Sequence, residues 1–300
     1  MSTPRVHKPA RLAGTTRRAM RRLGEPALDA LPYARDAPAT AETLAEEVPI
    51  AFVYNGEAHA VMLATPCDLE DFARGFTLTQ GIVAAAAEIE AIEIRPELAG
   101  IECAIRIPAA RAAALAPDAR RLPGVSACGL CGIRTLEDAV QWPGAVDSSV
   151  RVSGRALHLA LAGLRARQPM FLATGATHAA GFANEAGEVL CVREDVGRHN
   201  ALDKLVGALV AAGLDPRRGF VVLTSRASVE MVQKAARAGI GLLAAVSAPT
   251  ALAVTLADSA GLTLLGFVRD GRHTVYTHPE RVVDDARAIP HRAQEPRREH

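Results

Sequence analysis

The second half of the sequence alternates between apolar strand-like runs and helical repeats, and this alternation limits the folds open to the chain. After the breaker cluster Trp142-Pro143-Gly144, the pattern indicates one helix, two strands, and then helices and strands in turn. Strands separated by helices favour a layered domain with a mainly parallel sheet, because each helix buries one face against that sheet. The fold class we expect is therefore α/β, with a three-layer α/β/α domain over residues 151–285. The expected helices cover 153–167, 198–212, 228–238 and 250–259, and the expected strands cover 178–183, 188–194, 220–224, 242–246, 262–268 and 274–277.

Residues 45–125 predict a smaller α+β domain. Asn55-Gly56 lies between two apolar runs and favours a hairpin, because both residues accept a positive φ. The spacing over 69–79 predicts a helix, and alternation predicts two further strands at 89–95 and 101–107. Residues 1–44, which carry seven Arg or Lys before the first acid at Glu25, are expected to be a flexible basic N-terminal arm. Residues 286–300 are expected to be a tail.

Residues 126–150 are expected to form a loop and linker that carries a pair of cysteines, Cys128 and Cys131, among small residues. A C-x-x-C pair permits redox exchange, half of a zinc site, or sulfur relay. Zinc would need a second ligand pair, which the sequence lacks, so we expect no bound metal. A thioredoxin-like pair would open a helix after a strand, whereas this pair lies in a loop between domains. The residues alone leave the chemistry open. The other cysteines, Cys67, Cys103 and Cys191, are expected to be small buried residues.

Three polar clusters follow predicted strands, where ligands of open α/β sheets collect. They are Arg193–Lys204, Thr224–Ser228 and Phe267–Arg272. If the loops lie side by side, their arginines would suit a phosphate-bearing ligand. The alternatives are a capped helix start with a solvated face for the first cluster and an ordinary Asp-Gly turn for the third. The arginines in question are Arg193, Arg198, Arg226, Arg269 and Arg272.

Four motifs of the sequence resemble the FdhD/NarQ family of formate dehydrogenase accessory proteins, over roughly residues 45–285. They are Thr174–Ala180, Arg193–Lys204, Ser225–Ser228 and Ala244–Thr250. The resemblance implies a sulfurtransferase that takes persulfide sulfur from a cysteine desulfurase. It would pass this sulfur to the molybdenum cofactor, bis(molybdopterin guanine dinucleotide), before the cofactor enters apo formate dehydrogenase. In that reading Cys128 carries the persulfide and Cys131 assists or relays it. The cofactor-binding stretch would be Phe267, Val268, Arg269, Asp270, Gly271 and Arg272, while roles for Arg193, Arg198, His199 and Arg226 stay open.

The same resemblance implies a cytidine deaminase fold for the second domain, and this raises deamination as a rival activity. Zinc deaminases need His-x-Glu and Pro-Cys-x-x-Cys. Here His178 is followed two residues later by Ala180, and Ala127 stands where the proline would be. Deamination is therefore disfavoured. The alternatives to sulfur transfer are a non-catalytic chaperone of the molybdenum cofactor and a dithiol oxidoreductase that uses Cys128 and Cys131.

Charge and hydropathy set the expected surroundings of the protein. A formal net charge of +1 gives no global basic field, so we expect no nucleic-acid partner. The N-terminus has no apolar core of signal-peptide length. The uncharged run 238–257 is interrupted by glycines and by Pro249, so we expect no membrane segment. We expect a cytoplasmic protein, and the sequence leaves a homodimer open.

Overall fold

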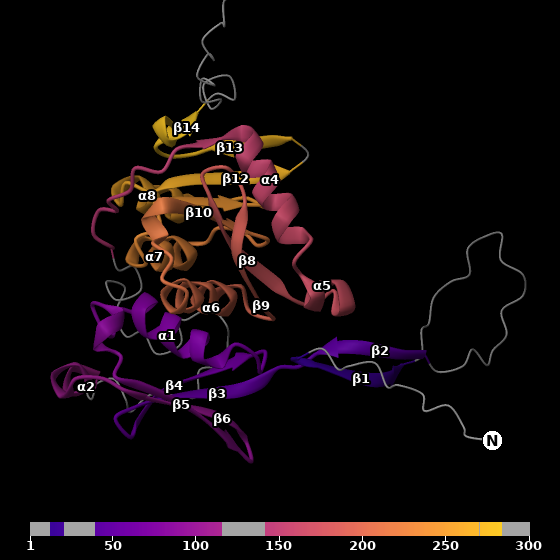
Figure 1. The fold of residues 1–300 in the computed structure, drawn as a ribbon, viewed down its shortest axis with the longest axis vertical. Coiled ribbons are helices and arrows are strands. Elements are labelled where there is room, and N and C mark those ends of the chain that lie inside the picture. Colours follow the sequence, from indigo (N-terminus) through magenta and orange to yellow (C-terminus); the bar gives the residue numbers. More distant parts are fainter. Residues whose placement is uncertain (1–12, 21–39, 116–141, 270, 284–300) are drawn as a thin grey trace, which may run out of the picture.

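The computed structural model describes residues 13–20, 40–115, 142–269 and 271–283, and it contains two stacked domains (Figure 1). The larger domain is built on a six-stranded sheet with the order β13-β12-β11-β10-β8-β9. No helix within the described ranges is both long and apolar enough to cross a membrane. The strands of the large sheet are β8 (His178–Asn184), β9 (Val189–Asp195), β10 (Gly219–Leu223), β11 (Leu242–Ala245), β12 (Thr263–Arg269) and β13 (Arg272–Val275).

The large sheet is mixed, which corrects the expectation of a mainly parallel sheet. Only β10, β11 and β12 pair in parallel, and the other three pairings are antiparallel. The reason lies in α4 (Gly154–Arg165) and α5 (Pro169–Thr174), which precede β8. The chain enters β8 at the edge where β10 ends, because Ala180 pairs with Leu223 and Asn184 with Gly219. Helix α5 was not predicted, because six residues are too few to show a helical repeat.

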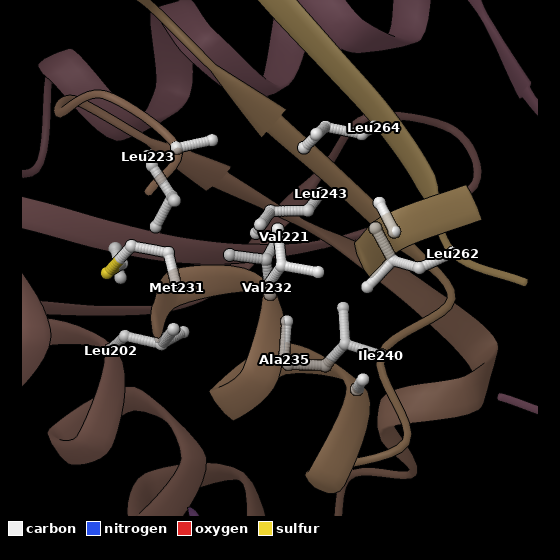
Figure 2. Close-up of a cluster of buried hydrophobic side chains, with 14 of the residues drawn as sticks. Leu202, Val221, Leu223, Met231, Val232, Ala235, Ile240, Leu243, Leu262 and Leu264 are labelled. Carbon is white, nitrogen blue, oxygen red and sulfur yellow. The ribbon is translucent and has the colours of Figure 1, made fainter. Parts of the chain in front are cut away.

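Helices cover both faces of the sheet, so the three-layer α/β/α prediction is confirmed. Helix α4 packs on one face, and α6 (Arg198–Ala211), α7 (Val229–Arg237) and α8 (Ala251–Ser259) pack on the other. Figure 2 shows the larger of the two cores, in which leucine and valine side chains of the strands meet Met231 and its neighbours on the helices. Ser153 caps α4 as expected, its hydroxyl accepting from the Ala156 N–H. The likeness to cytidine deaminases stays a prediction.

The smaller domain has a four-stranded sheet with the order β4-β3-β6-β5 and one helix on its face. Helix α1 (Leu69–Thr79) begins and ends where the sequence predicts. In the core of this domain, Phe76 of α1 stacks on Phe52 of the sheet, and Phe72 meets the same ring edge to face. The strands are β3 (Val48–Tyr54), β4 (Glu57–Ala64), β5 (Ala91–Glu97) and β6 (Gly100–Arg106), followed by α2 (Ala109–Leu115). The remaining short elements are β7 (Val152–Ser153), β14 (Val282–Val283), and 3-10 turns η1 (Ala86–Glu88), η2 (Pro216–Arg218) and η3 (Pro279–Arg281).

The prediction of a flexible arm over residues 1–44 is wrong for two segments. Strands β1 (Thr15–Met20) and β2 (Thr40–Ala45) pair antiparallel and form a ribbon that projects from the body (Figure 1). The two strands are also joined at the base of the ribbon, where the Glu46 N–H donates a hydrogen bond to the Gly14 carbonyl at 2.7 Å. The run Thr-Thr-Arg-Arg-Ala-Met shows no alternation of apolar and polar residues, so periodicity gives no strand signal there.

The two domains meet where α1 crosses α6 (Figure 1). Two glycines make this crossing so close that no side chain fits between the helices. A Cβ at Gly75 would overlap the carbonyl of Asp203, and a Cβ at Gly207 would overlap the carbonyl of Asp71. Because the obstacle in each case is backbone, neither helix can relieve the overlap by rotating a side chain.

We expect Gly207→Ala to lower the free energy of unfolding by about 3 kcal/mol through this overlap. Alanine is favoured over glycine inside a helix by about 1 kcal/mol, so any loss is assigned to the crossing. Urea unfolding followed by circular dichroism measures the change. Gly144→Ala is the control, because nothing lies within 4 Å of a Cβ at that position. Equal stability of the two variants would contradict the close crossing.

Candidate functional site

The predicted persulfide carrier Cys128 and its neighbour Cys131 lie outside the described residues. The three remaining thiols are poor nucleophiles, because burial keeps them protonated. Burial raises the pKa of Cys67 to about 11 and that of Cys103 to about 12, and it also raises the pKa of Cys191. Cys103 is buried as predicted, whereas Cys67 and Cys191 are only partly covered. None of these three thiols is therefore suited to nucleophilic sulfur chemistry.

Loops from several strands meet at one edge of the large sheet, as the sequence predicts. The loop after β10 contacts the loop after β11, since the Thr250 N–H donates to the Ala227 carbonyl at 3.1 Å. The loop after β11 in turn contacts β12, since the Phe267 N–H donates to the Ser247 carbonyl at 3.3 Å. Helix α6 begins at the same edge, because its preceding strand β9 ends at Asp195 opposite His178. This carboxyl edge is the candidate site.

The predicted cofactor stretch is the turn between β12 and β13. Phe267 has a φ of 54° and is exposed, and the Arg269 guanidinium lies 5.7 Å from the centre of its ring. Arg269 pairs with Arg272 across the turn, and both are exposed. Val268 is buried in the core and therefore supports the turn from inside. Asp270 lies outside the described residues, and Gly271 has a φ of 72°, which favours glycine.

The polar run Arg193–Lys204 has a different role from either of those expected for it. Most of its side chains bind the smaller domain or a neighbouring helix. Arg193 forms an ion pair with Asp71 of α1 at 2.7 Å. The Glu194 carboxylate accepts from the N–H groups of Met170 and Phe171 at the start of α5, at 2.9 and 2.8 Å. Both side chains are thus engaged by other groups of the protein itself.

A buried ion pair joins the domains at the start of α6. Lys204 Nζ lies 2.7 Å from Asp195 Oδ2, and both side chains are fully buried. Lys204 also donates to the Thr65 carbonyl, and Asp195 Oδ2 accepts from the Thr65 N–H at 3.0 Å. Asn200 adds a bond to the Leu63 carbonyl at 2.9 Å. Each partner of the pair thus has further hydrogen bonds, as buried charges require.

A second buried ion pair involves Asp203, the residue before Lys204 in α6. Lys234 of α7 donates to both carboxylate oxygens of Asp203 at 2.8 Å. Thr79, at the end of α1, donates its hydroxyl to the same carboxylate. Asn200, Asp203 and Lys204 share one face of α6 at spacings of three and four residues. In sequence that face resembles a solvated one, so nothing but its position beside a second domain could have revealed its role.

The first turn of α6 also meets the first turn of α7. His199 Nε2 lies 3.8 Å from Glu230 Oε2, and His199 is buried. The contact with His199 is the largest cause that holds the pKa of Glu230 at about 2, below its ordinary 4.5. A zinc deaminase would need His-x-Glu and a C-x-x-C pair. At this edge, Ala201 takes the place of that Glu after His199, and Ser225 and Ser228 have the spacing of the pair but are serines. Within the parts of the chain described, no group of three or more His, Cys, Asp or Glu could hold a metal ion.

A pocket of about 600 Å³ opens beside this edge, between the end of α4, helix α5 and the start of β8. His178 lines it, and burial together with the nearby Arg198 lowers the pKa of that imidazole. The sequence places His178 in the family-like motif Thr174–Ala180 and also shows that it lacks the Glu of a zinc deaminase. It gives no signal for the pocket, because half of the lining comes from the unpredicted α5 region. The lining residues are Arg165, Gln168, Phe171, Leu172, Gly175, Ala176, Thr177, His178, Thr224 and Val246.

We expect Lys204→Met to destabilise the protein by about 3–5 kcal/mol, because it leaves the Asp195 carboxylate buried without its cation. Adding Asp195→Asn should recover part of the loss, since the remaining group is then neutral. Denaturant unfolding of the single and double variants measures both changes. Arg95→Met, which breaks an exposed ion pair, is the control and should leave the midpoint unchanged. If Lys204→Met were as stable as wild type, the buried Lys204–Asp195 ion pair would not stabilise the junction of the domains.

Glu230 should make stability fall in acid. Its pKa is about 2 in the folded protein, whereas the ordinary pKa of a glutamate is 4.5. As the pH falls, the unfolded chain therefore takes up this proton before the folded protein does. The contribution is complete above pH 4.5 and is lost as the pH falls towards 2. We expect Glu230→Gln to be less stable than wild type at neutral pH, with the difference shrinking over this window. Urea midpoints measured from pH 6 to pH 2 check this, and a constant difference would contradict it.

Comparison with known proteins shows the family to which the chain belongs. The model of the FdhD/NarQ family matches residues 45–283. The sulfur carrier protein FdhD of Xanthomonas axonopodis pv. citri is 54% identical over 241 residues, which cover 80% of this chain and 86% of the relative. The protein of the same name from Bordetella petrii is 51% identical, with 80% and 87% covered. A crystal structure from Desulfotalea psychrophila, named as a formate dehydrogenase accessory protein, superposes with a TM-score of 0.64 at 25% identity and covers 82% of this chain and 93% of its own. Because the family model covers most of the chain, the protein belongs to the FdhD/NarQ family.

Proposed function

We propose that this protein is a sulfur carrier that serves the maturation of formate dehydrogenase. The observation that carries the proposal is the 54% identity to a sulfur carrier protein FdhD over 80% of the chain. The raised pKa values of Cys67, Cys103 and Cys191 support it, because they leave the Cys128/Cys131 pair as the thiols suited to nucleophilic work. The donor is a cysteine desulfurase, and the acceptor is the molybdenum of bis(molybdopterin guanine dinucleotide).

Loading is a thiol–persulfide exchange. The Cys128 thiolate attacks the outer sulfur of the persulfide on the desulfurase. A new S–S bond forms on Cys128 as the S–S bond of the donor breaks, and the donor cysteine leaves as a thiolate. One sulfur atom moves, and the pair of proteins undergoes no net oxidation.

Delivery as sulfide requires two electrons, and Cys131 can supply them. Its thiolate attacks the Sγ of Cys128 and expels hydrosulfide towards the acceptor. A disulfide between Cys128 and Cys131 remains, which a cellular thiol reductant returns to the dithiol. This scheme gives Cys131 the assisting role, and it uses the short spacing of the pair.

The acceptor is a large anion, and the carboxyl edge has groups that suit it. Arg269 and Arg272 present exposed guanidinium groups, which bind phosphates in a forked geometry. Phe267 presents an exposed ring beside them. Val268 is buried and therefore does not contact a ligand directly. Five of the six residues of the predicted cofactor stretch thus remain candidates for contact.

The direct test is sulfur loading. The full-length protein is incubated with a cysteine desulfurase and cysteine, and we expect the peptide that contains Cys128 to gain the mass of one sulfur atom. Cys128→Ser should abolish the gain, and Cys131→Ser should retain it while losing sulfide release in the absence of added thiol. Cys191→Ser is the control and should load as wild type does. Intact-protein and peptide mass spectrometry provide the readout.

Two outcomes would replace this function with another. If Cys128→Ala still matures formate dehydrogenase while Arg269→Ala and Arg272→Ala do not, the protein is a cofactor chaperone. If the pair instead cycles as a disulfide, reduces a test disulfide and never gains sulfur, the protein is a dithiol oxidoreductase.

A further inference from the structure

The ribbon of β1 and β2 belongs to no larger sheet. It forms a two-stranded sheet of its own, and within the described ranges β1 pairs with β2 alone. An isolated pair of strands is marginally stable in water, and a third strand or a packed face is needed for independent stability. In an antiparallel pair every second residue of each strand turns its N–H and C=O away from the partner. The ribbon therefore offers a row of backbone groups that a further strand can bind.

The root of the ribbon is fixed at the junction of the two domains. Gly14 lies so close to Thr65 that a Cβ at residue 14 would overlap the threonine side chain, and Met170 of α5 and Cys67 are the next nearest residues. Thr15 is buried. Helix α5 lies beside β2, so β1 is the outer strand of the pair (Figure 1). The ribbon thus starts from a packed base and carries β1 on its outer side.

The charge of the two strands is uneven. Strand β1 contains Arg17 and Arg18 and no acid, whereas β2 contains Glu42 and no base. Arg18 is exposed. The surrounding sequence strengthens the bias, because residues 1–24 hold seven Arg or Lys and no Asp or Glu. The β1 side of the ribbon is therefore positive, and opposite charges on neighbouring strands stabilise their pairing.

The same arginines decide which kind of strand can pair with β1. A second copy of β1 would bring arginines near arginines, and like charges on neighbouring strands are destabilising. The oppositely charged strand of a second copy, β2, lies beside its own α5. Charged side chains on an edge strand also discourage pairing with neutral edges. An extended segment that carries acids is the occupant that these charges favour.

We propose that the outer edge of β1 binds an acidic, extended segment of a partner protein as a third strand of the ribbon. Backbone hydrogen bonds between the segment and β1 supply the affinity, and carboxylates beside Arg17 and Arg18 supply the preference for acidic sequences. Helix α5 lines the pocket and lies beside β2, so a partner on the ribbon is held close to that pocket. The proposal concerns protein docking and holds whatever cargo the protein carries.

Fluorescence anisotropy with the full-length protein tests the proposal with three labelled peptides of equal length. The first alternates glutamate with valine or threonine, the second has lysine in place of each glutamate, and the third is the first with its backbone nitrogens methylated. We expect the acidic peptide to bind about tenfold or more tightly than the other two, because strand addition needs both the charge and the backbone bonds. No binding of the acidic peptide, or equal binding of it and either of the others, would overturn the proposal.

Variants place the binding on β1. Replacing both arginines of that strand, Arg17→Gln together with Arg18→Gln, should abolish the preference for the acidic peptide. The matched control is Arg217→Gln together with Arg218→Gln, because these are two consecutive, exposed arginines in η2 of the larger domain. The control should bind all three peptides as wild type does. Loss of the preference in the control as well, or in neither variant, would assign the binding to another surface and overturn the proposal.

Hydrogen exchange of the wild-type protein locates the contact without any substitution. Saturating acidic peptide should slow the exchange of amides in Thr15–Met20 and leave those of β5 and β6 unchanged, because a third strand covers the outer N–H groups of β1. Mass spectrometry of proteolytic fragments provides the readout. Slower exchange elsewhere without slower exchange in β1 would overturn the proposal.

Two results would give the edge of β1 to a different occupant and overturn the proposal. One is a single-stranded oligonucleotide that binds more tightly than the acidic peptide and loses its affinity when Arg17 and Arg18 are replaced. The other is a dimer of the wild-type protein, seen by analytical ultracentrifugation, that dissociates when the acidic peptide is added. We expect weaker binding of the oligonucleotide and no effect of the peptide on the oligomeric state.

Discussion

The crossing of α1 and α6 is the contact on which the rest of the structure depends. Gly75 and Gly207 bring the two backbones together, and the buried pairs Lys204–Asp195 and Lys234–Asp203 lie on the same face of α6. Buried ion pairs add little net stability compared with apolar groups, but a partner that loses its mate is costly. The two pairs therefore favour one register of α1 on α6 over its neighbours. The same helix α6 begins at the carboxyl edge, so its placement against the smaller domain also places the candidate site.

Apolar periodicity predicted most of the fold, because the strands and helices of both domains bury one face each. Helix α1 was predicted over its whole length, and the edge where the strand-end loops gather followed from the alternation of strands and helices. The direction of β8 could not be predicted, since it depends on α5, which is too short to show a repeat. The ribbon of β1 and β2 was missed for a related reason, because its sequence shows no alternation of apolar and polar residues.

The site was predicted less well than the fold, and the run Arg193–Lys204 shows why. A polar face on a helix looks the same in sequence whether it meets water, a ligand or a second domain. Five of its residues bond across the domain boundary to partners more than a hundred positions away in the chain: Arg193 bonds Asp71, Asp195 and Lys204 bond Thr65, Asn200 bonds Leu63, and Asp203 bonds Thr79. Such pairing is a tertiary fact that spacing cannot contain. The run Arg193–Lys204 is thus, in large part, a motif of domain assembly.

The separation of assembly residues from exposed arginines bears on the proposed acceptor site. Two basic residues of the polar run, Arg193 and Lys204, form ion pairs with carboxylates of the protein itself. Arg226, Arg269 and Arg272 stay exposed at the carboxyl edge. An acceptor bound there would therefore meet arginines that are not used in the ion pairs at the domain boundary. Because the residues of the proposed acceptor site and the residues of domain assembly are separate sets, a variant that weakens one function need not weaken the other.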